Sequence, residues 1–221
     1  MHADCLPHQA NASGALSALA RGSPENQAAI ARTGAIAPLC TLVRDGSPET
    51  KEQAASALWS LSNENTPNKA TIAKLGGIEP LVGLIVSGAS EKSAANAAGA
   101  LASLAAKHTE NRSSVAKRLV ALLNGKVAER AVRVMSAIST LCADNQANQL
   151  AIAKYGGIPP VIGWLSSPDP GAQKAAAFAL LHLAKENTTT QVLITNMSGI
   201  PPPCMQVLTT APFPHRCSLP I

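Results

Sequence analysis

Amide side chains recur at a regular interval in this 221-residue chain. Asn11, Gln53 and Asn96 are separated by 42 and 43 residues, and Arg133 follows 37 residues later. An amide donates and accepts hydrogen bonds at the same time, which suits pairing with the main chain of a peptide. The pattern therefore favours binding. The alternative is that these residues are solvated polar positions on exposed helix faces.

Residues that could support catalysis or bind metal are scattered along the chain. None of the five histidines lies at a spacing typical of a paired nucleophile or carboxylate. Cys5 with His8, and His215 with Cys217, lack the second pair that a structural zinc site needs. A phosphate-binding loop, a nucleophile elbow and a dinucleotide fingerprint are also missing from the sequence. We therefore expect no enzyme activity, no metal and no cofactor.

Composition limits the classes of partner. Charged residues make up 14% of the chain and the formal net charge is +5, so acidic partners are permitted but not required. Only five residues are aromatic. Nucleic-acid binding by base stacking needs periodic aromatic residues. Trp59 and Trp164 are not on equivalent segments, so we expect both to pack in the core. We therefore expect no nucleic-acid partner.

Two further features concern the compartment. The five cysteines are odd in number, and two lie in apolar helical patterns, which favours free thiols in a reducing compartment, the cytosol or nucleus. The sequence has no secretory signal and no window of 18 apolar residues, so we expect no membrane span.

The apolar residues repeat with the same period as the amides. Five similar segments are in register, at steps of 42, 43, 37 and 42 residues: 12–20, 54–62, 97–105, 134–142 and 176–184. A second set of residues follows the same steps, and each is expected to cap a short helix: Asn26, Asn68, Asn111, Asn148 and Thr190. Self-similarity at about 40 to 47 residues is the signature of a helical solenoid, whose repeats bury their apolar faces by stacking.

One full unit shows three predicted helices. The first begins at Asn26 and stops at Gly34, a residue suited to a left-handed turn. The second has Pro38 near its start, where a missing N–H costs little. The third follows over 48–62. Third helices are predicted near 9–20, 48–62, 91–105, 127–142 and 172–184.

These units resemble armadillo repeats. The resemblance is carried by a short first helix ending in Gly-Gly-Ile-x-Pro (76–80 and 156–160), a second helix like PLVGLI (80–85) and a third like AAGALASLA (97–105). It covers about residues 9–208 and is greatest to vacuolar-protein-8-like and plant armadillo proteins. It implies a right-handed α-solenoid of stacked three-helix repeats, whose third helices line a concave groove for extended peptides or partner proteins.

The resemblance also locates a candidate site. In importin alpha and beta-catenin, Asn residues on the third helices hold the peptide main chain; the matching positions here are Ala18, Ser60, Ser103, Thr140 and His182. The positions matching the importin alpha Trp residues hold Gly14, Ser56, Gly99, Ser136 and Phe178. Together with the amide series, the predicted groove is lined by Asn11, Gln53, Ser60, Asn96, Ser103, Arg133, Thr140 and His182.

The leading hypothesis is a non-catalytic protein–protein interaction scaffold, expected to be a monomer, that binds a protein or peptide partner. An importin-alpha-like cargo adaptor is an alternative, disfavoured by the substituted ladders and the net basic charge. Another is the substrate-recognition part of a ubiquitin ligase, in which a U-box would lie upstream of residue 1.

The third unit is irregular. The Gly-Gly-Ile-x-Pro sequence is missing, and SVAKR (114–118) continues directly into LVALLNG (119–125), so the first and second helices are predicted to fuse in a shortened unit near 111–125. The region is also basic, and its predicted surface is formed by Lys107, Arg112, Lys117, Arg118, Lys126 and Arg130. Such a surface would attract an acidic partner, a phosphorylated segment or anionic lipid head groups, unless it is only a solvated face.

Both ends depart from the repeat. The first unit lacks its first and second helices, and residues 1–8 are expected to be a disordered start. Residues 209–221 contain Pro212, Pro214 and Pro220 without helical periodicity and are expected to be a disordered tail. Because a solenoid needs polar caps, we expect a fragment of a longer array.

Overall fold

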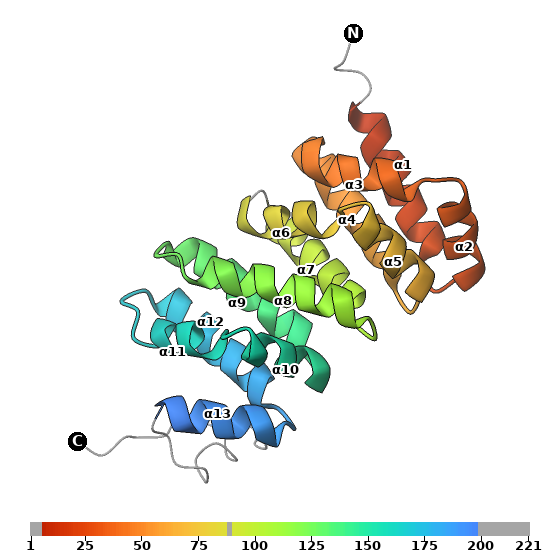
Figure 1. Ribbon diagram of the computed structural model, residues 1–221. Helices are drawn as coiled ribbons and strands as arrows, with labels where there is room; N and C mark the ends of the chain where they lie inside the picture. Colours follow the sequence, from red (N-terminus) through yellow and green to blue (C-terminus); the bar gives the residue numbers. More distant parts are fainter. Residues whose placement is uncertain (1–5, 88–89, 199–221) are drawn as a thin grey trace.

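The computed structural model describes residues 6–87 and 90–198, and within them the chain is an all-α solenoid (Figure 1). Its helices, stacked in chain order, are α1 (Leu6–Ala20), α2 (Pro24–Arg32), α3 (Ile36–Asp45), α4 (Pro48–Ser62), α5 (Thr66–Lys74), α6 (Ile78–Ser87), α7 (Glu91–Ala105), α8 (Thr109–Leu123), α9 (Ala128–Cys142), α10 (Gln146–Lys154), α11 (Ile158–Trp164), α12 (Pro170–Ala184) and α13 (Thr188–Ser198). Residues 6–8, expected to be disordered, belong to α1. The predictions for 1–5 and for 199–221 lie outside the described residues.

Three units have three helices each: α2–α4, α5–α7 and α10–α12. The irregular unit has only two, because α8 runs without a break over 15 residues and α9 follows it, which confirms the predicted fusion. The helices α1, α4, α7, α9 and α12 are equivalent third helices, and each contacts the next. They form one continuous layer of the stack.

Alanine and leucine explain how closely the third helices pack. Leu58 and its equivalents Leu101 and Ile138 are at most 1% exposed, and Ala54 and Ala97 are fully buried. Short Ala side chains let neighbouring helices approach, and the larger side chains fill the space between them. Truncating a buried leucine in such a core costs about 2 to 5 kcal/mol.

The periodic Asn residues do not cap the first helices, which corrects the prediction. Asn68 is the third residue of α5, and the cap is Asn65, whose Oδ1 accepts the backbone N–H of Asn68 at 3.0 Å. The Asn68 amide instead donates to Leu61 O at 2.9 Å, in the last turn of the preceding third helix. The same backward bond, seven residues long, is made by Asn26, Asn111, Asn148 and Thr190.

The residue after three of these positions links one unit to the next. Gln27 Nε2 donates to Ser60 O at 2.9 Å and to Asn63 O at 3.2 Å, at the end of the next third helix. Lys69 Nζ donates to Ala106 O at 2.7 Å, and Gln149 Nε2 donates to carbonyls at the end of α12. These bonds satisfy carbonyl groups that a helix end leaves unpaired.

The link from α8 onward is different. Arg112 occupies this linking position in the fused unit, and its Nε is buried without a hydrogen-bond partner. The Nδ2 atoms of Asn68 and Asn111 also donate across to the preceding unit, at Gln27 O and Lys69 O. At the equivalent Asn148, the amide oxygen Oδ1 is buried and has no hydrogen-bond partner. Among the described units, the joint between α8 and α10 is therefore the one with buried side-chain polar atoms that lack a hydrogen-bond partner.

Candidate binding groove

One face of α1, α4, α9 and α12 is open to solvent, whereas the equivalent positions on α7, Gly99 and Ser103, are buried. On α4, Gln53, Ser56 and Ser60 are partly exposed and Trp59 is exposed, at spacings of three or four residues that place them on one stripe. The equivalent stripe on α12 includes Phe178. Because successive third helices contact each other, these stripes join into one surface, which we call the groove face.

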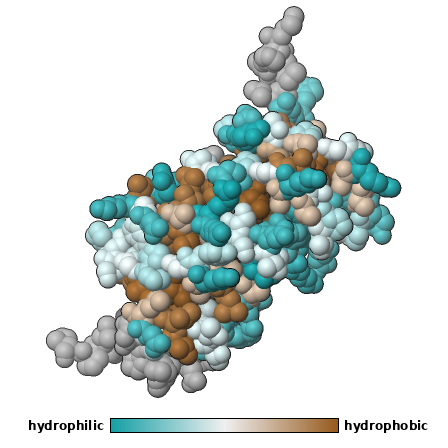
Figure 2. All heavy atoms as spheres, in the orientation of Figure 1, coloured by the Kyte–Doolittle hydropathy of each residue, from teal (hydrophilic) through white to brown (hydrophobic). Residues whose placement is uncertain are grey.

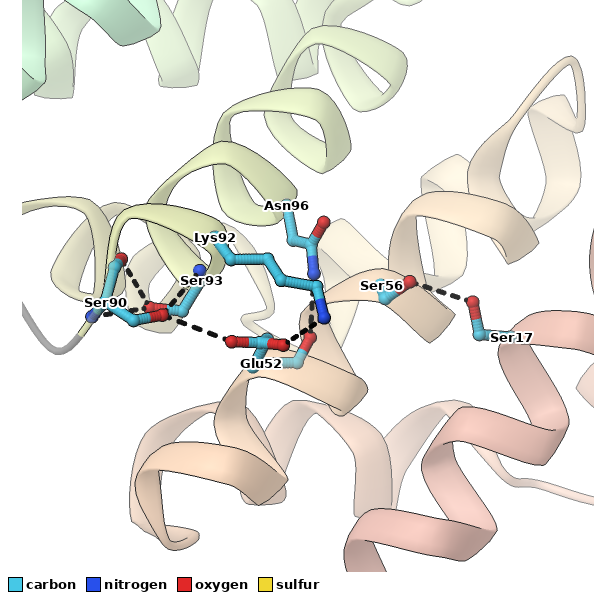
Figure 3. Close-up of polar contacts among 7 residues, drawn as sticks. All are labelled: Ser17, Glu52, Ser56, Ser90, Lys92, Ser93 and Asn96. Carbon is cyan, nitrogen blue, oxygen red and sulfur yellow. Dashed lines mark hydrogen bonds and ion pairs between the residues drawn. The ribbon is translucent and has the colours of Figure 1, made fainter.

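The first part of the groove face is held by polar contacts between α4 and α7 (Figure 3). Asn96 Nδ2 donates to Glu52 O at 3.2 Å, and the Glu52 carboxylate accepts Ser90 Oγ at 3.2 Å and pairs with Lys92 Nζ at 2.8 Å. The hydrogen bond and charge of Glu52 raise the pKa of Lys92. Asn96, expected to bind a partner, therefore uses its amide to tie two helices together.

The other members of the amide series differ in their surroundings. Arg133 donates to Val86 O at 3.2 Å and pairs with Glu129, so it ties α9 to the end of α6. Gln53 lies over the α1 backbone, where its Oε1 would be 3.1 Å from a Cβ on Gly14. Asn11 is exposed. The predicted series is present along the stack. Within the described part of the chain, Asn96 and Arg133 use their side chains in hydrogen bonds to neighbouring helices, whereas Asn11 and Gln53 do not.

The predicted hydroxyl and imidazole positions are also distributed differently. Ser60 Oγ lies 3.1 Å from Ser17 Oγ, which also lies 2.9 Å from Ser56 Oγ (Figure 3 shows the Ser17 and Ser56 pair). Ser103 is buried and accepts a hydrogen bond from Ser62 Oγ at 2.9 Å. Ser103 is thus part of the contact between α4 and α7 and does not line an open groove.

Thr140 and His182 keep accessible positions on the groove face. Thr140 is exposed, and its Oγ1 donates to Ser136 O at 3.2 Å within its own helix. His182 is half-buried, with Nδ1 2.9 Å from Phe178 O. Either side chain can contact a partner without breaking a link between units.

Trp59 is a surface residue that sequence reasoning assigned to packing. Its ring lies against α7, where a Cβ on Gly99 would be only 2.8 Å from two ring carbons, yet the residue is 42% exposed. Phe178 on α12 is also 42% exposed. The signal was available in the sequence, because Trp59 directly precedes Ser60 and follows Ser56 by three residues.

The floor of the groove face carries no formal charge. The C-terminal halves of the third helices, 12–20, 54–62, 97–105, 134–142 and 176–184, contain no Asp, Glu, Lys or Arg. Charged residues occur in the N-terminal halves, where Lys92 pairs with Glu52 and Arg133 with Glu129. The floor is therefore built from small side chains, hydroxyl groups and two exposed aromatic rings.

The predicted basic surface is divided among several contacts. Lys117 Nζ lies 5.3 Å from the centre of the Tyr155 ring, and Arg118 pairs with Glu79. On the face seen in Figure 2, hydrophilic side chains form separate groups among apolar ones. Two of the predicted cations are thus already engaged within the chain.

The remaining cations lie far apart. Lys107 precedes α8, whereas Lys126 and Arg130 follow it, and a helix of 15 residues is about 22 Å long. This separation exceeds the screening length of about 8 Å in physiological salt. The basic stretch is therefore not one concentrated patch.

The two described cysteines, Cys40 and Cys142, are buried free thiols. Burial raises the pKa of Cys40 to about 11, and it also raises the pKa of Cys142. The described ranges contain no group of three or more potential metal ligands. Within the same ranges no single helix is long and apolar enough to cross a membrane; the bent pair α5 and α6 has the length and composition together, but breaks by 77°.

Comparison with known proteins agrees with this geometry. Residues 23–63 and 65–106 match the armadillo/beta-catenin-like repeat family. One engineered protein of known structure is 26% identical, with a TM-score of 0.66 over 95% of this chain and 86% of its own. Another is 28% identical, with a TM-score of 0.62 over 91% and 50%. No curated protein matches the sequence.

A designed armadillo repeat protein, solved in complex with the peptide (KR)4, shares the fold at 23% identity, with a TM-score of 0.59 over 89% of each chain. The fold and the stacked third helices define an α-solenoid repeat protein. Within that class, the chain is similar to armadillo repeat proteins over residues 23–63 and 65–106.

Proposed function

We propose that this chain is a non-catalytic interaction scaffold that binds an extended segment of a partner protein along the groove face. The observation that carries the proposal is the open stripe on α1, α4, α9 and α12, which lie in one continuous stack with α7. A partner strand crossing this stack would meet polar groups that include Gln53, Thr140 and His182. The peptide complex of the designed armadillo protein is a precedent for this use of the fold.

The charge-free floor disfavours the cargo-adaptor alternative. Lysine-rich signals are held by carboxylates or stacked indoles, and the floor has no carboxylate. The ubiquitin-ligase alternative depends on a domain outside these 221 residues and remains a hypothesis. The greater likeness to vacuolar-protein-8-like and plant armadillo proteins is also a hypothesis. A cytosolic or nuclear location remains our proposal, supported by the free thiols of Cys40 and Cys142.

Selection of peptides followed by a blocked groove tests the function. Random peptides would be selected by phage display on the full chain, and their affinities measured by fluorescence anisotropy. Thr140→Arg places a bulky side chain on the groove face. Thr71→Arg is the matched control, because Thr71 is also an exposed threonine bonded to a carbonyl four residues earlier, but lies on α5.

We expect Thr140→Arg to weaken binding at least tenfold and Thr71→Arg to leave it unchanged. Equal affinity for both variants would place the binding surface elsewhere and overturn the proposal. So would a selection that enriches no peptide.

A further inference from the structure

Building on the proposed function, we infer that the partner segment is uncharged where it crosses the groove face, and that it places apolar side chains against Trp59 and Phe178. Two observations specify this chemistry. One is the pair of exposed rings, and the other is the charge-free floor between them.

Trp59 is held in place for contact. Its ring rests on the α7 backbone at Gly99, where any larger residue would collide with three ring carbons at 2.8 to 2.9 Å. One side of the indole is therefore fixed against the protein, and the remaining 42% of the residue faces solvent. A rigid, partly exposed indole offers a large apolar area with little loss of side-chain freedom on binding, which is why Trp dominates many binding surfaces.

Phe178 supplies the second apolar contact. It lies on the groove face of α12 and is exposed to the same fraction as Trp59. Its neighbour one turn later is His182, whose ring nitrogen is directed to Phe178 O. An apolar side chain of the partner can bury the Phe178 ring, while the His182 ring provides a polar edge.

The floor between the two rings selects against charged segments. The half 134–142 exposes Ser136 and Thr140, and the half 97–105 is buried apart from the partly exposed Ala102. Neither half contains Asp, Glu, Lys or Arg. A charged side chain laid on this floor would lose water without gaining an opposite charge, and that loss is unfavourable. Neutral segments avoid this penalty, and their main chain can bond with hydroxyls such as that of Thr140.

The stack also sets the spacing of the two contacts. The Trp59 ring lies between α4 and α7, so about two and a half helix spacings separate it from α12. At 8 to 10 Å per spacing, the distance is about 20 to 25 Å. An extended strand rises about 3.3 Å per residue, so the two apolar residues of the partner should be about six to eight positions apart.

The test uses two glycines within helices. Gly99→Ala adds a Cβ in contact with the Trp59 ring carbons and must displace the ring. Gly83→Ala is the control, because Gly83 is exposed on α6 and its Cβ would meet nothing within 4 Å. Both changes favour helix formation, so neither is expected to unfold the chain. Phe178→Ala is paired with Leu150→Ala, a residue on α10 with 43% exposure.

We expect the selected peptides to have neutral cores with two apolar residues six to eight positions apart. We expect Gly99→Ala and Phe178→Ala each to weaken binding about tenfold, and both controls to have no effect. In the unmodified chain, bound peptide should shift Trp emission to shorter wavelength, because it covers the exposed ring of Trp59. The other tryptophan, Trp164, is half-buried and already packs against the core, so the shift reports on Trp59.

Other outcomes separate this inference from the proposed function. Enrichment of Lys- and Arg-rich or Asp- and Glu-rich peptides that Thr140→Arg still blocks would overturn the inference and leave the groove function standing. Neutral peptides insensitive to both Gly99→Ala and Phe178→Ala would also overturn it.

Discussion

The backbone N–H of Asn111 donates to Nδ1 of His108 at 3.3 Å, so an imidazole caps the fused helix α8. The other described first helices are capped by oxygen atoms of Ser23, Asn65, Asn145 and Asn187. An imidazole nitrogen accepts a hydrogen bond only while it carries no proton. The irregular unit is therefore capped by a different type of acceptor from the others.

His108→Ala should destabilise the chain by about 1 kcal/mol, because it removes the acceptor of the Asn111 N–H at the start of α8. His108→Asn should keep most of that stability, since Asn is a favoured N-cap residue and already caps α5 and α10. Urea unfolding followed by circular dichroism measures both variants. Equal stability of His108→Ala and the natural chain would contradict the assignment.

Asn68→Ala should destabilise the chain by about 2 kcal/mol, because it leaves the carbonyls of Leu61 and Gln27 without their amide partner in a buried position. Asn26→Ala is the control, since Asn26 is exposed and makes only the backward bond to Leu19 O. It should cost about 0.5 to 1 kcal/mol. Urea denaturation followed by circular dichroism measures the free energy of unfolding of both variants. Equal losses of stability would show that burial of the Asn68 amide does not determine its contribution to stability.

Arg112→Gln should stabilise the joint between α8 and α10. Glutamine at the equivalent positions, Gln27 and Gln149, donates to carbonyls at the end of the next third helix, whereas Arg112 leaves its Nε buried and unpaired. We expect a gain of about 1 kcal/mol in the free energy of unfolding. Arg130→Gln, which removes the same charge from an exposed position, should change stability by less than about 0.5 kcal/mol. A loss of stability in Arg112→Gln would mean that its guanidinium makes a stronger contact than Gln can replace.

The thiols of Cys40 and Cys142 should be unreactive in the folded chain. Burial raises the pKa of Cys40 to about 11, so at pH 8 only about one molecule in a thousand carries the thiolate, compared with about one in four at an unperturbed thiol. The thiolate fraction grows only as the pH approaches the raised value. Alkylation followed by peptide mass mapping should show both residues reacting more than a hundredfold more slowly than in urea. Rapid labelling without denaturant would instead indicate local opening of α3 or α9.

The sequence by itself determined the architecture, because its signals are local. The recurrence of Leu58, Leu101 and Ile138 at a fixed period predicted the third helices, and Gly34 and Gly156 predicted the turns that end first helices, where φ is 80° and 78°. The loss of the Gly stop near Arg118 predicted one continuous α8. Each of these features depends on residues within a few turns of one another, where spacing and backbone conformation are enough.

Only the tertiary structure decided which polar side chains remain available to a partner. Asn96, Ser103 and Arg133 were expected on the groove face, but each makes contacts with residues about 40 positions away that link neighbouring helices. Trp59 was expected in the core, but Gly99 gives it room to lie across α7 and stay exposed. Helical spacing identifies the face on which a residue lies. What that residue contacts depends on the approach of the next repeat, and no local pattern encodes that distance.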